Sequence, residues 1–297
     1  MRFTEIQKNE MVGLLISRYD QSGFNNKGKF ATTFGLSAAD MSNLEGKKFE
    51  LLGDQKWVKI ASFLNYSKTG EKWETAHTYV FDFIYKQLET CQSQSINAML
   101  IDKAGVGKSY AAKWYAQNRP NVFYIDCSIS SRRAPFLLAI AKSLGLGSVK
   151  VNEAFELSVE ALKCLDNPLL ILDESGDLDN SCILVIKALC NALEHRCGIY
   201  LIGSDGLKRK INIGVNYCSV GYTELFSRLG KRFQSALPLE NPVETLKIIK
   251  EMAEDIANAN GVKDAENIKK IKDRLSQNGI GDLRQTEREI KKIQQHA

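Results

Sequence analysis

The chain has 297 residues, of which 44% are hydrophobic and 25% charged, and its formal net charge is +5. This composition excludes disordered, collagen-like and coiled-coil proteins, and at about 150 residues per domain the length suggests roughly two domains. The small positive charge is compatible with a nucleic-acid partner but does not require one. No segment reaches the roughly 18 consecutive apolar residues that span a bilayer, and the N-terminus lacks the apolar core of a signal peptide, so we expect no membrane partner.

The seven cysteines are odd in number, no two are spaced as CxxC, and several lie within apolar runs. This distribution argues against a disulfide framework or a zinc site. We expect reduced, mostly buried thiols in a cytoplasmic protein.

Residues 27–46 have the spacing of a helix-turn-helix. In this spacing a small residue, a glycine and an apolar residue stand at positions five, nine and fifteen, which here are Ala31, Gly35 and Met41. Ser37 is a good N-cap for the second helix. The segment resembles the DNA-binding domains of phage repressors, and a small helical interaction domain is the alternative.

The second helix of this motif carries few groups that can read bases. Its exposed positions would be Ala38, Ala39, Ser42 and Asn43, and only Asn43 has the amide used in bidentate base readout. Lysines flank the motif at Lys27, Lys29, Lys47 and Lys48. This pattern favours phosphate contacts, and therefore weak sequence preference.

The centre of the chain alternates apolar strands with helices. An amphipathic helix within residues 69–94 repeats apolar side chains at intervals of three and four. The predicted strands are 96–101, 121–127, 168–174 and 198–203, and the predicted helices begin at Ser109 and cover about 134–144 and 181–194. Apolar strands alternating with helices predict an α/β fold whose parallel sheet is covered on both faces.

Strands stop at about Asn241, and helical patterns follow, with breaks at Gly261 and at Asn278-Gly279. We therefore expect three parts. They are an all-α helix-turn-helix domain over 1–68, a parallel-sheet core over 69–239 and a helical lid over 240–297.

A phosphate-binding loop follows the first predicted strand. Residues 102–109, DKAGVGKS, match the end of the pattern G-x-x-x-x-G-K-[ST], with Asp102 in place of the first glycine. Backbone N–H groups in a tight loop before a helix bind phosphate; Lys108 would reach the β- and γ-phosphates of ATP, and Ser109 would bind Mg²⁺. The segment expected to bind the nucleotide comprises Lys103, Ala104, Gly105, Val106, Gly107, Lys108, Ser109 and Tyr110.

The third predicted strand ends in two acids, in the run LLILDE. In an open α/β sheet the carboxyl ends of the strands face the ligand crevice. Asp173 would hold Mg²⁺ together with Ser109, and Glu174 would polarise the attacking water. The loop and this strand end together predict nucleotide hydrolysis.

The two motifs resemble those of AAA+ ATPases. Ser204 follows the fourth strand, where that family has its sensor 1 residue, and Arg284 in the run GDLR resembles sensor 2 of the lid. The run LFSRLGKRF resembles the arginine-finger region, with Arg232 as the first candidate and Arg228 as the second. Since such an arginine comes from a neighbouring subunit, the resemblance implies a homo-oligomer.

Two basic clusters lie in the core. Arg132 and Arg133 follow the second strand, and Lys208, Arg209 and Lys210 follow Ser204 in what reads as a short loop, with Asp205 as the one acid nearby. In an AAA+ ring such loops line the central channel, so the resemblance favours DNA threading over solvated surface charge.

A helix-turn-helix domain ahead of a small AAA+ core, with Trp73-Glu74-Thr75 before it, resembles the phage Mu B transposition protein family. That resemblance implies an ATP- and Mg²⁺-dependent protein that binds double-stranded DNA with little sequence preference. It implies assembly as a ring or helical filament, activation of a transposase, and a bacterial or mobile-element source. Alternatives are a helicase-loading replication ATPase, a nucleotide-gated transcriptional regulator and a signalling ATPase whose first domain binds protein.

Overall fold

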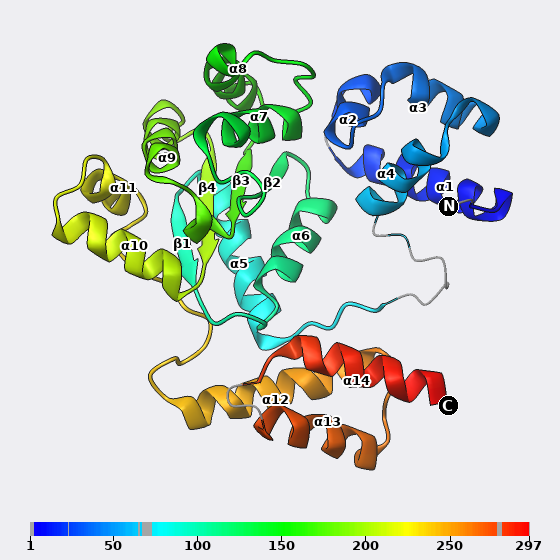
Figure 1. Ribbon diagram of the computed structural model, residues 1–297, viewed down its shortest axis with the longest axis vertical. Coiled ribbons are helices and arrows are strands. Elements are labelled where there is room, and N and C mark those ends of the chain that lie inside the picture. The colour runs from blue at the N-terminus through cyan, green and yellow to red at the C-terminus, as the bar shows by residue number, and fades with distance from the viewer. Residues whose placement is uncertain (1–2, 23, 65, 67–72, 278–280, 297) are drawn as a thin grey trace.

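A computed structural model describes residues 3–22, 24–64, 66, 73–277 and 281–296. The predicted domain boundary at residues 68 and 69 and the predicted break at Asn278-Gly279 lie outside this part of the chain. Figure 1 shows three regions, which we call the head (residues 3–66), the core (73–240) and the lid (241–296).

The head is a bundle of short helices around an apolar centre. Its elements are α1 (Glu5–Gln21), α2 (Lys27–Thr33), α3 (Ala38–Glu45), the 3-10 turn η1 (Phe49–Leu51) and α4 (Asp54–Leu64). Trp57 and Phe30 are among the largest fully buried side chains, and Ala31 and Met41 are buried as the helix-turn-helix spacing predicts. The head is therefore stabilised mainly by packing around large rings.

The turn between α2 and α3 forms at the predicted residues. Gly35 has φ +78°, a left-handed conformation that favours glycine. The Ser37 hydroxyl accepts from Asp40 N at 3.2 Å, and the Asp40 carboxylate accepts from Ser37 N at 3.0 Å, a reciprocal N-cap. The expected pair of helices is present, and its use in binding DNA stays a prediction.

The core contains a four-stranded parallel sheet in the order β1-β4-β3-β2. Its strands are β1 (Ala98–Ile101), β2 (Val122–Asp126), β3 (Leu169–Asp173) and β4 (Gly198–Gly203). Every residue of β1, β3 and β4 is buried, as a sheet covered on both faces requires. The predicted α/β class and all four predicted strands are confirmed.

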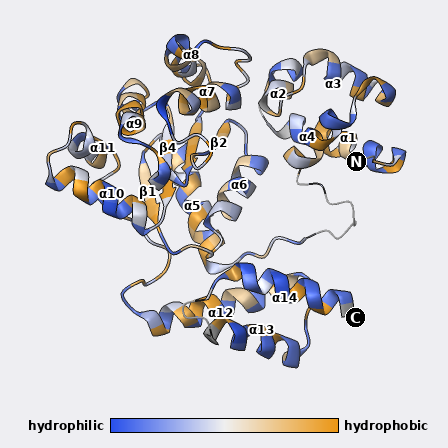
Figure 2. Cartoon of the chain, viewed as in Figure 1, coloured by the Kyte–Doolittle hydropathy of each residue, from blue (hydrophilic) through white to orange (hydrophobic). Residues whose placement is uncertain are grey.

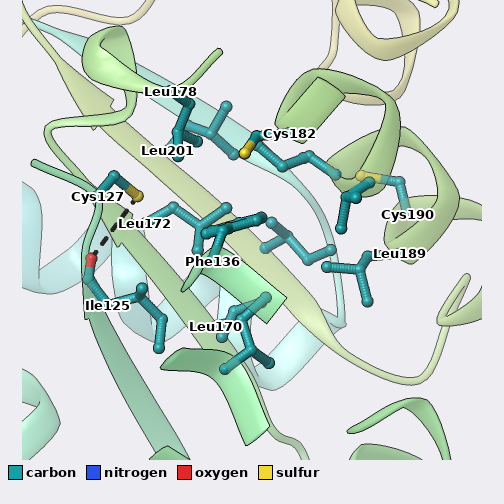
Figure 3. Packing of buried hydrophobic residues seen from close by; sticks show 14 of the residues in the cluster. Ile125, Cys127, Phe136, Leu170, Leu172, Leu178, Cys182, Leu189, Cys190 and Leu201 are labelled. Atoms are coloured by element: carbon teal, nitrogen blue, oxygen red, sulfur yellow. Dashed lines mark hydrogen bonds between the residues drawn. The ribbon is translucent and has the colours of Figure 1, made fainter. Parts of the chain in front are cut away.

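Alternate strand residues pack against different helices. Leu170 and Leu172 face one layer, and Leu169 and Ile171 face the other. Figure 3 shows Phe136 packed among side chains of the first layer. The core helices are α5 (Tyr79–Gln94), α6 (Lys108–Asn118), α7 (Arg133–Ser143), α8 (Val151–Lys163), α9 (Asn180–Ala192), α10 (Asp205–Asn216) and α11 (Tyr222–Arg228), with the 3-10 turn η2 (Ser175–Asp177) after β3.

One sequence prediction about this layer is wrong: Lys208, Arg209 and Lys210 lie in helix α10, not in a short loop. Leu207 and Ile211 are buried one helical turn apart, which anchors α10 to the core and outweighs the run of three charges. Helix α8 was not predicted at all.

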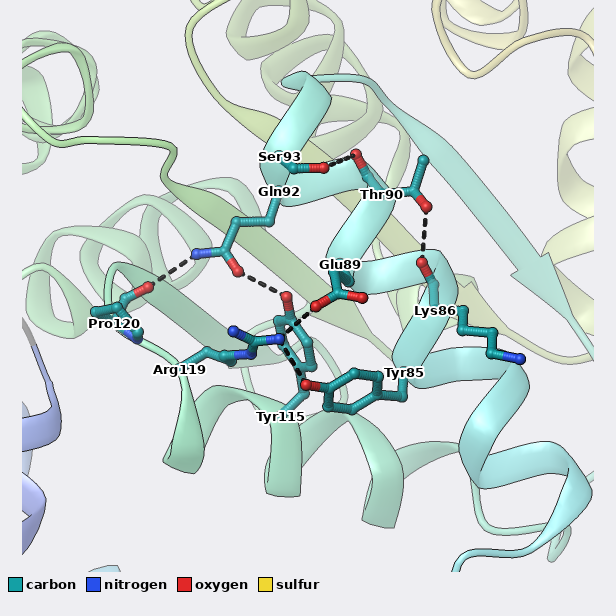
Figure 4. Close-up of polar contacts among 9 residues, drawn as sticks. All are labelled: Tyr85, Lys86, Glu89, Thr90, Gln92, Ser93, Tyr115, Arg119 and Pro120. Atoms are coloured by element: carbon teal, nitrogen blue, oxygen red, sulfur yellow. Dashed lines mark hydrogen bonds and ion pairs between the residues drawn. The ribbon is translucent and has the colours of Figure 1, made fainter.

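A polar clasp joins α5 to α6, the helix that begins at the phosphate-binding loop (Figure 4). Arg119 donates to the Tyr85 hydroxyl at 2.6 Å and pairs with Glu89. The Tyr115 hydroxyl donates to Gln92 at 2.7 Å. These contacts fix the far end of α6, so its first turn is held against a rigid neighbour.

The lid consists of α12 (Pro242–Ala259), α13 (Ala265–Gln277) and α14 (Leu283–His296), so the predicted helical C-terminal region is confirmed. Figure 2 shows hydrophilic outer faces on α13 and α14. Their apolar side chains, such as Ile271, Leu275 and Ile290, are buried with those of α5 and the sheet.

The head also contacts the core. The Phe24 ring meets the edge of Phe123 in β2 with centroids 6.5 Å apart. A Cβ atom at Gly145 would come within 2.6 Å of the Lys29 carbonyl oxygen, so α2 lies directly against the turn after α7. The first helix of the predicted DNA-binding motif therefore faces the core.

Five of the seven cysteines are buried, as predicted, while Cys164 and Cys218 are exposed. Within the described residues, no helix combines the length and apolarity that crossing a membrane would take.

Candidate nucleotide site

A cavity of about 220 Å³ lies where the phosphate-binding loop, the end of β3 and the lid meet. Its lining includes Gly105, Gly107, Lys108, Ser109 and Tyr110 from the loop and α6, with Glu174 after β3 and Arg284 in the lid. The structure thus brings residues from three distant motifs to one cavity.

Two glycines shape the loop. Gly105 has φ +78° and Gly107 has φ +95°, and Gly107 is the N-cap of α6. A Cβ atom at Gly105 would lie 2.2 Å from the Asp282 carboxylate, and Leu283 N donates to the Gly105 carbonyl at 2.9 Å. Gly105 is therefore required both by its backbone conformation and by the lid that presses against it.

The Lys108 side chain folds over the loop. Its Nζ donates to the carbonyl oxygens of Asp102 at 2.7 Å and Lys103 at 2.6 Å, and the residue is only 8% exposed. Burial lowers the pKa of the Lys108 ammonium, while nearby carboxylates oppose that shift. An ammonium has three donors, so one remains for a phosphate oxygen.

Asp102 has a structural use that explains its place in the loop. Its carboxylate is 1% exposed, and Oδ2 accepts from Ala236 N at 2.8 Å, Leu237 N at 3.1 Å and the Ser235 hydroxyl at 3.0 Å. Asp102 thereby fastens the end of β1 to the segment that leads into the lid. Sequence reasoning did not foresee this role, because its partners lie more than 130 residues away.

The acids after β3 occupy two environments. Asp173 is 1% exposed; its Oδ2 accepts from the Tyr124 hydroxyl at 2.6 Å and its Oδ1 from Glu174 N at 3.0 Å. Glu174 is exposed and has φ +51°, which turns it out of the strand direction. Burial, followed by the charge of Asp173, raises the pKa of the Glu174 carboxyl above the ordinary glutamate value.

These groups fit Mg²⁺ bound together with a nucleotide. Magnesium on a nucleotide needs only one or two protein ligands besides phosphate oxygens and water, and Asp173 and Ser109 supply a carboxylate and a hydroxyl. Among the residues the structure describes, no cluster of three or more acids, histidines or cysteines could hold a metal by itself. The donor set therefore suits a nucleotide-borne ion rather than a resident one.

Ser204 and the two finger candidates lie outside the lining of this cavity. Ser204 is the N-cap of α10, directly after β4, which lies between β1 and β3 in the sheet. Arg228 pairs with Glu194. Arg232 is exposed and makes no ion pair with any described residue, so it is the arginine available to another subunit.

Sequence reasoning missed part of the cavity wall. Ala76, Thr78 and Phe81 line it on the core side, and Ile256 and Glu287 line it from the lid. Asn260 at the end of α12 holds the Glu74 backbone through two hydrogen bonds, of 3.0 and 3.1 Å. The run beginning at Trp73 was noted by resemblance, whereas the lid residues sit in plain amphipathic helices that carry no local motif.

The basic clusters lie along one edge of the sheet, after the carboxyl ends of β2 and β4. Arg132 and Arg133 are exposed at the start of α7. Lys210 donates to the carbonyls of Gly176 and Leu178, so its ammonium is already used to hold the turn after β3.

This edge also carries more acid than the sequence suggested. Asp179 N donates to the Ser131 carbonyl at 2.9 Å, which brings Asp179 beside the arginine pair. Its carboxylate caps α9 by accepting from Cys182 N at 2.9 Å. The expectation that Asp205 is the one acid nearby is therefore wrong.

Comparisons with known proteins agree with this site. Residues 84–211 match the family described as an AAA domain. The Mu-like prophage FluMu DNA transposition protein B of Haemophilus influenzae is 26% identical over 187 residues, which cover 58% of this chain and 64% of that protein. The chain thus spans slightly less than two thirds of this relative's length.

Solved structures support the same fold. The Aeropyrum pernix Orc1 protein in complex with DNA superposes with a TM-score of 0.50 at 15% identity, over 72% of this chain and 58% of that one. Cdc6p from Pyrobaculum aerophilum has a TM-score of 0.49 at 17% identity, over 76% and 60% of the two chains. Residues 84–211 therefore form an AAA ATPase domain, in a chain related to the transposition protein B of a Mu-like prophage.

Proposed function

We propose that this protein is an ATP-dependent DNA-binding ATPase that assembles on double-stranded DNA and activates a transposase. The observation that carries the proposal is the single cavity that joins Lys108, Glu174 and Arg284. The relationship to a DNA transposition protein supports the choice of process.

Each residue of the cavity has a chemical task in ATP hydrolysis. Lys108 and the loop N–H groups bind the phosphates, and Arg284 contacts them from the lid. Asp173 and Ser109 hold Mg²⁺, which neutralises phosphate charge when bound. Glu174, with its raised pKa, is suited to orient and polarise the attacking water near neutral pH.

Arg232 completes the site from a neighbouring copy. Transition-state charge in phosphoryl transfer is stabilised by an arginine that reaches in from outside. Arg228 is held by Glu194 in its own subunit, which leaves Arg232 as the free guanidinium of this segment. Hydrolysis would therefore require a homo-oligomer, as a ring or a filament.

DNA binding is assigned mainly to the edge of the sheet. Arg132, Arg133, Lys208 and Arg209 are exposed there and suit phosphate contacts. Lys210 contributes by holding the turn after β3 rather than by reaching DNA. In the head, Lys29 is exposed while Lys27 is paired with Glu45, and Asn43 is half-buried, so the head offers weaker contacts.

The test is ATP-dependent DNA binding by the full chain. Fluorescence anisotropy with a labelled duplex should show binding with ATP and much weaker binding with ADP. Lys108→Ala should remove the difference, while Lys86→Ala, which changes an exposed lysine of α5, should leave it intact. Equal binding with ATP, with ADP and by Lys108→Ala would refute the coupling of nucleotide to DNA.

The transposase partner needs a separate measurement. Strand transfer by the transposase encoded beside this protein should be stimulated by the wild-type chain with ATP and not by Lys108→Ala. ATP-dependent DNA binding without any stimulation would favour the replication or helicase-loading alternative.

A further inference from the structure

A second cavity lies at the junction of the head and the core. It has a volume of about 450 Å³, within the usual range for small-molecule sites. Residues of α1, α4, α6 and β2 line it, so both regions contribute walls. We call it the junction cavity. It is separate from the nucleotide cavity, and the two share no lining residue.

The charge of the junction cavity is one-sided. Arg18, Lys113 and Arg119 line it, and its lining contains no aspartate or glutamate. Arg119 is balanced by Glu89 in the clasp of Figure 4. Lys113 is exposed and makes no ion pair with any described residue; its Nζ lies 5.3 Å from the centre of the Tyr124 ring.

Arg18 is the unusual member of this set. Its guanidinium donates to the Phe63 carbonyl at 2.9 Å and to the Gln117 side-chain oxygen at 3.3 Å, and both acceptors are neutral. Burial lowers the pKa of this guanidinium. A guanidinium has five N–H donors, so most of them remain for an anion in the cavity.

Aromatic surface accompanies the cations. The half-buried rings of Phe24 and Phe63 line the cavity, beside the buried ring of Phe123. Cations that bind phosphate, next to rings that can stack on a base, form the combination by which proteins hold nucleotides.

We propose that the junction cavity binds a nucleotide, with its phosphate on Arg18 and Lys113 and its base against the phenylalanine rings. The nucleotide is either a free one or a residue of single-stranded DNA. Because the ligand would touch α1 and α6 together, it would hold the head against the helix that begins at Lys108.

A direct path leads from this cavity to the catalytic acids. Tyr124 lines the junction cavity, and its hydroxyl donates to Asp173 at 2.6 Å. Gln117, the partner of Arg18, is one residue before the end of α6. An occupied junction cavity would therefore act on both the loop helix and the residue assigned to Mg²⁺.

The experiment uses the full chain carrying Lys108→Ala, which removes the first nucleotide site. Titration with a fluorescent ADP analogue should show residual saturable binding, competed by unlabelled ADP. Adding Lys113→Gln should weaken that binding at least tenfold, and Lys86→Gln on α5 should not change it. Lys113 is exposed, so its substitution tests the site even if Arg18→Gln disturbs packing of the head.

A labelled oligo-dT separates the two sources. If the oligonucleotide binds and ADP does not compete, the ligand is single-stranded DNA; if ADP alone binds, the ligand is a free nucleotide. Absence of both, or binding indifferent to Lys113→Gln and Arg18→Gln, overturns the proposal. Failure of the ATPase assignment looks different, because Lys108→Ala and wild type would then bind ADP equally while Lys113→Gln still weakened binding.

Discussion

The core and the head use polar groups in opposite ways. In the core, Asp102, Lys108 and Asp173 are buried beside the nucleotide cavity, and each has named hydrogen-bond partners. In the head, Asp40 is the buried charged side chain among the described residues, and aromatic packing does most of the rest. The difference teaches that polar substitutions in the core should alter chemistry and domain coupling, whereas those in the head should alter local stability or surface contacts.

The largest effect is expected at the finger. Arg232→Ala should lower the rate of ATP hydrolysis by about 10³-fold or more, the usual worth of an arginine finger. Arg228→Ala is the matched control, because it removes an arginine that pairs with Glu194 in its own subunit. Steady-state phosphate release at saturating ATP and DNA measures both.

A mixing experiment tests whether the finger acts between subunits. Arg232→Ala and Glu174→Gln proteins should each be nearly inactive, and their mixture should regain part of the activity. No recovery in mixtures that co-assemble on DNA would mean that Arg232 does not act on a neighbour.

Glu174→Gln should lower hydrolysis by about 10²-fold to 10⁴-fold while nucleotide binding persists, since it removes a general base. The raised pKa of Glu174 also predicts a pH effect. The carboxyl takes up its proton at a higher pH than an ordinary glutamate, so activity should fall as pH is lowered through that pKa. The pH profile of kcat measures this loss, and the same acid limb persisting in Glu174→Gln would contradict the assignment.

Asp102→Ala should destabilise the junction of sheet and lid by about 2–4 kcal/mol, because it leaves buried N–H donors of Ala236 and Leu237 without an acceptor. Urea unfolding of the full chain measures the change in free energy. Asp102→Asn keeps one side-chain oxygen and should lose less. Unfolding of Asp102→Ala at the wild-type urea concentration would contradict the structural role.

The basic edge of the core and the head can be compared on DNA directly. The double change Arg132→Ala with Arg133→Ala should lower the slope of log affinity against log salt by about two, since each phosphate contact contributes about 0.9. Lys27→Ala with Lys29→Ala should lower it by about half as much, because Lys27 is paired with Glu45. Equal or larger losses from the head pair would make the head the main DNA-binding region.

The smallest effect is expected in the head. Ser37→Ala removes the N-cap of α3 and should cost about 1 kcal/mol of stability without lowering ATP hydrolysis. Ser42→Ala, on the exposed face of the same helix, should cost less. Thermal unfolding checks the first claim, and a drop in hydrolysis by Ser37→Ala would show that the head supports catalysis.

Much of the fold could be read locally. Apolar strands ending in Gly-Lys-Ser or in paired acids announce their own structure, because strand, loop and helix start are set within a few residues. Helix α10 could not be read this way, since Lys208, Arg209 and Lys210 interrupt its apolar pattern and its anchors, Leu207 and Ile211, are recognisable only against the core.

By itself, the sequence determined the parallel sheet, the two glycines and lysine of the loop, and the acids after β3, because each depends on neighbours in the chain. Only the tertiary structure decided how Asp102 is used, which of Arg228 and Arg232 is free, and that Arg18 faces a cavity without a carboxylate. Those outcomes depend on contacts between residues far apart in the chain, such as Asp102 with Ala236 and Arg18 with Gln117. The ordinary net charge of +5 likewise acquires meaning from placement, since packing decides which cations are paired and which remain free for a partner.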